Sequence, residues 1–170
     1  LSLPERNCAR TPMQWSTEPH AGFTAAGKPV RPVISGGAYG YEHVNVAAQR
    51  RDPDSLLNWT ERALRMRQEI PEVSWGSFKV LPQAKSSVLV MRYDWRNNFV
   101  LFVHNLVADP LEIELAAGTI GEGGEHLINL LSEDHSEAEA SGRHCILLEP
   151  YGYRWFRVGG LDYLLKRSEV

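Results

Sequence analysis

The sequence is poor in cysteine and has no long apolar segment. It contains two cysteines, Cys8 and Cys145, and neither belongs to a Cys-x-x-Cys pair. A disulfide framework normally uses more cysteines, so we favour two free thiols in a reducing cytoplasm, with one Cys8–Cys145 bridge as the alternative. The longest apolar runs, such as Phe99 to Val103, are far too short to cross a bilayer. No secretion leader is visible, and we expect no membrane partner.

The sequence also lacks a large excess of positive or negative residues. The 18 Lys and Arg residues are scattered among 21 Asp and Glu residues, which leaves a net charge of -3. Because no basic face is available for a phosphate backbone, nucleic acid is not an expected partner. The six histidines lack metal-binding helical spacing, and no Cys/His cluster accompanies them. We therefore expect no cofactor in this chain.

The first 51 residues predict an irregular but ordered arm. They contain many Pro, Gly, Ser, Thr and Asn residues and show no sustained period of two or 3.6 residues. The same stretch carries Trp15, Phe23, Tyr39 and Tyr41, in which a disordered linker would be poorer. We interpret this stretch as an arm that packs onto another part of a larger protein.

One amphipathic helix is expected after the arm. Asp52 is a good N-cap, Pro53 suits the first helical position, and Asp54 favours the positive end of the helix dipole. Apolar residues then recur at helical spacing through Leu56–Leu64. The Ile70-Pro71 step ends the run. These signals predict a helix of about five turns.

Short β-branched and aromatic runs follow Pro71. The expected strands are 78–81, 88–93, 99–105, 111–115, 127–131, 145–148 and 153–158. Asp94–Asn98 supplies a hairpin turn, and residues 118–124 and 132–142 are expected to be surface loops. The pattern predicts a mainly β fold, in which a C-terminal antiparallel β-sandwich follows one amphipathic helix and the irregular arm. We divide the chain into residues 1–75 and 76–170.

Paired carboxylates are the signature of glycosidic chemistry, because one protonates the leaving oxygen while the other attacks the anomeric carbon or activates water. The available pairs are Asp52/Asp54, Glu133/Asp134 and Glu137/Glu139. The first pair suits helix capping, and the others fall in a polar loop without enclosing aromatic residues. We predict that the chain has no catalytic dyad and therefore no catalytic residue of its own.

Two arginines near the start of the arm are candidates for sugar binding. Arg6 and Arg10 lie close in sequence to Gln14, Trp15 and Phe23. A guanidinium offers a planar fork of donors to sugar hydroxyls, and an aromatic face packs on the apolar side of a pyranose. The alternative is that Trp15 and Phe23 anchor the arm while Arg10 pairs with a carboxylate.

Three motifs carry a resemblance to a known family. They are Arg10-Thr11-Pro12-Met13-Gln14-Trp15 with the nearby Ala21-Gly22-Phe23, the segment Tyr41–Trp59, and Tyr151–Val158. Together they resemble alpha-amylase-superfamily glycoside hydrolases that act on short alpha-glucosides, trehalose synthases among them. In that family the three motifs lie in the loop after the eighth barrel strand, at the entry to the eighth barrel helix, and in the closing strand of the C-terminal domain.

The resemblance implies that residues 1–75 end a catalytic (β/α)8 barrel and that residues 76–170 form a C-terminal β-sandwich domain. Because the first residue is Leu1 rather than Met, we expect a piece of a longer parent protein. The family's catalytic carboxylates and usual calcium ligands precede this stretch. Any calcium therefore belongs to the missing barrel, and this piece alone is expected to be inactive.

The resemblance further implies a parent that converts maltose to trehalose by a retaining double displacement. Arg10 would contact the plus-one sugar with Arg6 nearby, and Trp15 and Phe23 would anchor the loop. The expected partners are maltose and trehalose, bound by the parent enzyme, and the catalytic barrel.

Three alternatives stay open. The parent could hydrolyse alpha-glucosides as an alpha-glucosidase or amylase, because hydrolysis and isomerisation share this loop. The chain could instead be a non-catalytic carbohydrate-binding or structural module, with Trp75, Trp95 and Tyr151 as a sugar platform. A homo-oligomer is a third alternative, since the helix and the arm would expose apolar area without a barrel to cover them.

Overall fold

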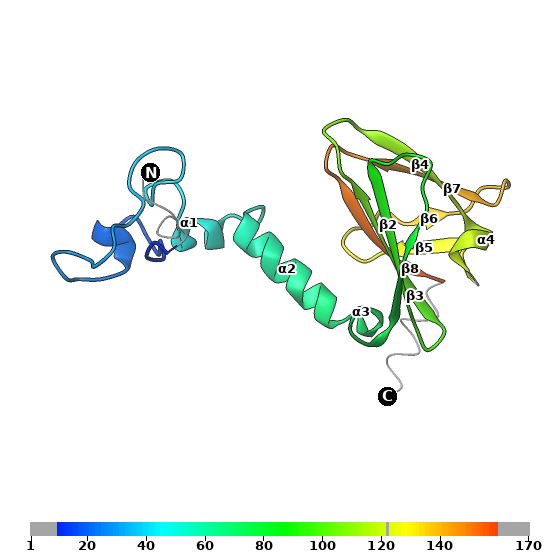
Figure 1. Ribbon diagram of the computed structural model, residues 1–170, viewed down its shortest axis with the longest axis horizontal. Helices are drawn as coiled ribbons and strands as arrows, with labels where there is room; N and C mark the ends of the chain where they lie inside the picture. Colours follow the sequence, from blue (N-terminus) through cyan, green and yellow to red (C-terminus); the bar gives the residue numbers. More distant parts are fainter. Residues whose placement is uncertain (1–9, 122, 160–170) are drawn as a thin grey trace. The chain divides into compact units, whose positions relative to one another are not determined.

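The computed structural model describes residues 10–121 and 123–159. The chain divides into two compact units, residues 1–65 and 66–170. In Figure 1 the first unit carries the arm and short helices, coloured blue to cyan, and the second carries the sheets, coloured green to orange. Within the described ranges, no helix is long and apolar enough to cross a membrane.

A tight turn folds the arm back on Trp15. Its centre is the 3₁₀ turn η2 (Pro19–Gly22). The main-chain N–H groups of Trp15 and Ser16 both donate to the carbonyl of Ala21, at 2.9 and 3.1 Å. Gly22 has a φ of +65°, and a Cβ at this position would lie 2.5 Å from Ser16 Oγ. Only glycine meets both conditions without strain, which explains the glycine of the Ala-Gly-Phe motif.

Helix α1 (Val46–Arg51) joins two of the sequence motifs. Its N-cap is Asn45, whose side chain accepts the N–H of Ala48 at 2.8 Å. The N–H groups of residues 46 and 47 donate to the carbonyls of Gln14 and Trp15, at 2.9 and 3.0 Å. The first amides of this helix therefore find partners in the Arg10–Trp15 motif rather than in water.

Helix α2 (Leu56–Gln68) starts later than predicted. Asp52 is the C-cap of α1, and its carboxylate accepts the N–H of Asp54 at 2.9 Å between the two helices. Ser55 supplies the cap instead, because its Oγ accepts the N–H of Asn58 at 3.2 Å. The predicted Asp52 cap was wrong. The helix has 13 residues, which is about 3.6 turns instead of five.

The second unit is an antiparallel sandwich preceded by the short helix α3 (Pro71–Trp75). One sheet has the strand order β1-β2-β3-β8-β5-β6, and the other pairs β4 with β7. The predicted mainly β fold is confirmed. The strands in the described ranges are β1 (Ser77–Leu81), β2 (Val88–Trp95), β3 (Asn98–Asn105), β4 (Leu111–Ala116), β5 (His126–Asn129), β6 (Ser136–Glu137), β7 (Arg143–Leu148) and β8 (Tyr153–Val158).

The core lies between the two sheets. Strand β7 alternates exposed and buried residues, so one of its faces meets solvent and the other carries Ile146 and Leu148 inward. These side chains belong to the same buried cluster as Leu101, Val103 and Phe156 from the six-stranded sheet. Facing apolar surfaces of this kind define a sandwich.

The outer face of the six-stranded sheet is buried near α3. Val100 and Phe102 of β3 share a second cluster with Ile70, and the ring of Phe102 stacks on Trp155 at 4.5 Å. Beside them Arg157 binds Glu72 of α3 at 2.5 Å, with side-chain exposures of 7% and 0%. An unpaired charge in such a place would be costly. The pair therefore fixes α3 against β8.

Two predicted loops contain regular structure. Helix α4 (Ala117–Ile120) occupies part of 118–124, and Ile120 is buried in the main core. Strand β6 interrupts 132–142 and pairs with β5. The β2–β3 hairpin follows expectation more closely. Its loop residues Arg96 and Asn97 both have positive φ, 49° and 63°, as a tight two-residue turn requires.

Candidate functional site

A cavity of about 500 Å³ adjoins the start of the described arm. Arg10 and Phe23, both singled out from sequence, line it together with Met13. Phe23 is 49% exposed, so part of its ring remains available to a ligand. The volume falls in the range of about 300–1,000 Å³ that is usual for small-molecule sites. An arginine fork beside an aromatic ring is suited to a pyranose.

Gln14 and Trp15 contribute to the arm in a different way. The side chain of Gln14 donates to the carbonyls of Tyr39 (3.2 Å) and Val44, and it lines a second cavity of about 370 Å³. Trp15 is 47% exposed and is not among the described residues that line either cavity. Its main-chain groups hold the turn at Ala21 and the start of α1. Anchoring by its ring stays a prediction.

Arg6 and Cys8 lie outside the described residues. The role of Arg6 beside the sugar therefore stays a prediction, as does the state of the Cys8 thiol. Cys145, on β7, is an exposed free cysteine.

Two further cationic residues line the 500 Å³ cavity. Lys28 and Arg31 border it together with Arg10, and sequence reasoning did not select them. They belong to no family motif that we identified. The available signal was their charge, since few charged residues occur in this part of the arm.

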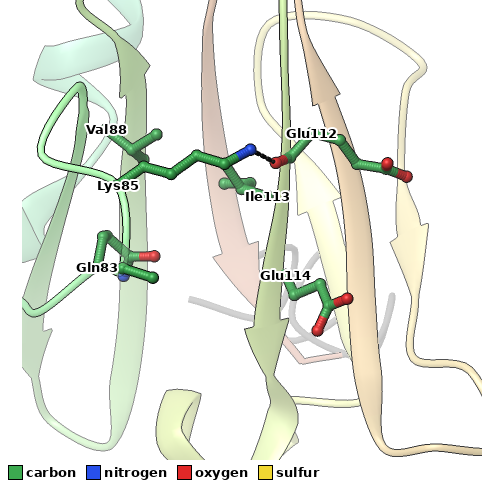
Figure 2. Close-up of a pocket in the computed structure, with 7 residues that line it drawn as sticks. Gln83, Lys85, Val88, Glu112, Ile113 and Glu114 are labelled. Atoms are coloured by element: carbon green, nitrogen blue, oxygen red, sulfur yellow. Dashed lines mark hydrogen bonds between the residues drawn. The ribbon is translucent and has the colours of Figure 1, made fainter.

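A cavity of about 470 Å³ lies between β4 and the β1–β2 connection in the second unit. Figure 2 shows Lys85 reaching across it, with its amine 2.7 Å from the main-chain carbonyl oxygen of Glu112. The carboxylates of Glu112 and Glu114 point away from that amine. Glu114 instead binds Arg143 at 2.5 Å. The two acids do not converge on a common point, as glycosidic chemistry would require.

A smaller cavity of about 260 Å³ is bordered by two acids that share one arginine. Arg154 lies 2.9 Å from Glu149 and 3.4 Å from Asp134. Its hydrogen bonds hold the pKa of Glu149 below the ordinary value. Glu149 therefore stays ionised at neutral pH and is unsuited to act as a general acid.

The three acid pairs noted in the sequence all lie on exposed residues. Asp52 and Asp54 form the turn between α1 and α2. Glu133 lies 3.8 Å from His135, and Glu137 lies 3.9 Å from His126. Among the residues that the structure describes, no cluster of His, Cys, Asp and Glu has the makings of a metal site.

Comparison with known families accounts for most of the chain. Residues 3–76 match the family described as alpha amylase, catalytic domain. Residues 98–157 match the family described as sucrose hydrolase-like, C-terminal domain.

Individual relatives agree with these matches. The trehalose synthase of Pimelobacter sp. (strain R48) is 33% identical over 166 residues, which cover 94% of this chain and 29% of that protein. The trehalose synthase/amylase TreS of Mycolicibacterium smegmatis is 38% identical over 124 residues, or 66% of this chain and 21% of that protein. The crystal structure of the trehalulose synthase MutB from Pseudomonas mesoacidophila MX-45 superposes with a TM-score of 0.68 at 27% identity, covering 90% of this chain and 26% of that one.

The chain thus spans less than a third of the length of these relatives. Its matches include both a catalytic-domain family and a C-terminal-domain family, and the sandwich of the second unit has the mainly β architecture expected of the latter. The chain belongs to the alpha-amylase family of glycoside hydrolases.

Proposed function

We propose that the whole protein containing this chain is an intramolecular glucosyltransferase that converts maltose into trehalose. One observation carries the proposal. Arg10–Met13 and Phe23, which belong to the two motifs of the arm, border a cavity of sugar size, within a chain that is 33% identical to a trehalose synthase over 94% of its length.

The proposed chemistry is a retaining double displacement. A carboxylate outside this chain attacks the anomeric carbon, and a second carboxylate protonates the leaving oxygen and later activates the acceptor. The released glucose turns in the site and attacks again through its anomeric hydroxyl. Water would compete with it and give hydrolysis, so the site must exclude water. We assign that closing role to the arm, as loops commonly serve it in enzymes.

The residues of the arm then have distinct tasks. Arg10 donates hydrogen bonds to the plus-one sugar, with Arg6 beside it. Phe23 and Trp15 hold the loop in place. The sandwich is a structural domain, and the catalytic barrel is its main partner. Any calcium would be held by that barrel, because we assign no metal ligand to this chain.

Hydrolysis of alpha-glucosides is the second candidate function. The Mycolicibacterium relative carries both synthase and amylase in its name. A synthase and an amylase of this kind can therefore differ mainly in how well the site excludes water.

Product analysis on the whole protein separates the two candidates. We expect maltose to give trehalose as the main product with little free glucose, as followed by NMR of the anomeric protons. Formation of glucose without trehalose would show that the whole protein is a hydrolase and not an isomerase. No turnover of any alpha-glucoside would contradict both.

A non-catalytic carbohydrate-binding module makes a different prediction. Titration of the sandwich unit with maltodextrin should then give measurable binding, whereas a structural domain should give none.

A further inference from the structure

Part of the Arg10–Trp15 motif lines two cavities at once. Thr11, Pro12 and Met13 border both the 500 Å³ cavity, which we assign to the sugar, and the 370 Å³ cavity. We call these three residues the shared wall. In the part of the chain that the structure describes, the shared wall makes no hydrogen bond of its own. Its position therefore depends on the residues that flank it.

Gln14 follows the shared wall directly and is tied to the chain at three points. Its side-chain amide donates to the carbonyls of Tyr39, at 3.2 Å, and Val44. Because both partners are acceptors, the group that faces them must be the NH₂ and not the amide oxygen. The main-chain carbonyl of Gln14 accepts the N–H of Val46 at 2.9 Å. One residue thus joins the end of the shared wall to the segment 39–46.

The segment 39–46 is itself held by hydrogen bonds. The N–H of Val44 donates to the carbonyl of Gly40 at 2.9 Å. The segment leads into α1, where the side chain of Gln49 accepts the N–H of Leu57 of α2 at 3.0 Å. A hydrogen-bonded scaffold therefore positions a wall that lacks such bonds, and the contact between the two is Gln14.

We propose that Gln14 is a positioning residue for the sugar rearrangement, and that it limits the entry of water by holding the shared wall in place. The residue is not among those that line the 500 Å³ cavity, so it acts through the wall and not on the sugar. This inference rests on the proposed function, because it takes that cavity as part of the sugar site. It deepens the function by naming a residue that sets the balance between isomerisation and hydrolysis.

The two outcomes diverge at the covalent glucosyl intermediate. In isomerisation, the anomeric hydroxyl of the retained glucose attacks the anomeric carbon, the bond to the enzyme carboxylate breaks, and the hydroxyl proton passes to the second carboxylate. The product is trehalose. In hydrolysis, water attacks the same carbon, the same bond breaks, and water gives its proton to the second carboxylate. The products are two glucose molecules. A looser wall admits water more often and therefore raises the ratio of glucose to trehalose.

Two variants of the whole protein, incubated with maltose and followed by NMR, test the proposal. Gln14→Met keeps the length of the side chain but has no N–H donor. Gln14→Glu keeps its shape but turns a carboxylate towards two carbonyl oxygens. We expect each variant to raise the ratio of glucose to trehalose about fivefold or more, which corresponds to one or two lost hydrogen bonds. A residue with a merely structural role would lower both products together and leave the ratio unchanged.

Gln83→Met is the matched control. The amide of Gln83 also donates to a main-chain carbonyl, that of Leu81 at 3.3 Å, but it lies in the second unit. The substitution removes the same chemical group and should leave the ratio of glucose to trehalose unchanged. An equal rise in this control and in the Gln14 variants would overturn the proposal, because it would reflect general loosening of the protein.

An unchanged ratio in both Gln14 variants also overturns the proposal. Should these variants fail to fold, Gly40→Ala tests the same contact from the other side. A Cβ at Gly40 would lie 2.6 Å from the main-chain nitrogen of Gly36, so the loop that carries both acceptor carbonyls must shift. We expect the ratio to rise here as well, and an unchanged ratio would then reject the role of Gln14.

Failure of the proposed function gives a different result. If the natural protein makes no trehalose, the isomerase is wrong, and amide hydrogen exchange decides on Gln14. The N–H groups of Val46 and Ala47 bind the carbonyls of Gln14 and Trp15. Their exchange should be about fivefold faster in the Gln14 variants than in the natural protein. Equal exchange rates would show that Gln14 does not position this part of the arm.

Discussion

The sandwich and the arm are stabilised in opposite ways. In the sandwich, Leu101, Val103 and Leu148 are completely buried between sheets of the same unit. In the described arm, residues 10–45, Ala21 is the one buried apolar side chain, whereas Val30 and Tyr39 are 102% and 75% exposed. The sandwich therefore supplies its own core. The arm is held mainly by main-chain hydrogen bonds at Trp15 and α1.

This difference indicates where stability and function lie. Apolar side chains exposed together usually face another surface or a ligand. Binding residues are often found on loops that a more rigid scaffold positions. We therefore expect substitutions in the sandwich to change the free energy of unfolding, and substitutions in the arm to change sugar handling or local order.

The buried ion pair should give the largest effect. Glu72→Ala leaves Arg157 charged and without this partner in a buried site, and we expect a loss of about 3–5 kcal/mol in the free energy of unfolding. Urea denaturation of the chain measures it. As a control, Glu114→Ala breaks the exposed pair with Arg143 and should cost less than about 1 kcal/mol. Similar losses for both variants would show that α3 is not fixed by the pair.

Arg10 tests the functional side of the comparison. In the whole protein Arg10→Ala should lower kcat/KM for maltose about 10- to 100-fold, because it would remove the hydrogen bonds that we propose between the guanidinium and the sugar. Arg10→Lys keeps the charge but not the planar fork and should recover only part of the loss. Thermal unfolding should change little. A kcat/KM for maltose that is unchanged in Arg10→Ala would show that Arg10 does not contact the sugar.

Gly22 tests the order of the arm. Gly22→Ala combines a φ of +65° with a Cβ 2.5 Å from Ser16 Oγ, and we expect a local cost of about 1–3 kcal/mol. Amide hydrogen exchange at Trp15 should accelerate while the sandwich keeps its protection. Gly27→Ala is the matched control, because a Cβ there meets nothing within 4 Å. Unchanged exchange at Trp15 in the Gly22 variant would mean that the turn does not order the arm.

The Glu149–Arg154 pair should give the smallest effect, visible mainly as a pH dependence. Arg154 lowers the folded-state pKa of Glu149. The pair therefore adds stability above the unfolded-state glutamate pKa of about 4.3, and this stability is lost as the pH falls through the lower folded-state pKa. Arg154→Ala should return the Glu149 pKa toward its ordinary value in an NMR titration. Arg143→Ala should not move it.

Much of the sandwich was predictable from the sequence, because its strands are short apolar runs between turn residues. Arg96-Asn97, for example, forms the expected hairpin turn. Helix α1 was not predicted, since it has six residues and its first amides are satisfied by Gln14 and Trp15, distant in sequence. The predicted N-cap of α2 was wrong because Asp52 and Ser55 are both suitable N-cap residues, and the fold uses Ser55.

The candidate site was less accessible to residue-level reasoning. Side-chain chemistry made Arg10, Trp15 and Phe23 candidates, and the family resemblance supplied their roles. The structure places Arg10 and Phe23 at one cavity. Lys28 and Arg31 follow no motif, and they reach that cavity only because the arm folds back on itself. The Glu72–Arg157 pair joins residues 85 positions apart, so no local pattern reveals it.

The most direct test compares the isolated 170-residue chain with the whole protein, each incubated with maltose and followed by NMR. We predict trehalose from the whole protein and no product from the isolated chain, because our proposal assigns the reacting carboxylates to a part of the protein outside this chain. Formation of trehalose or glucose by the pure isolated chain would contradict this directly.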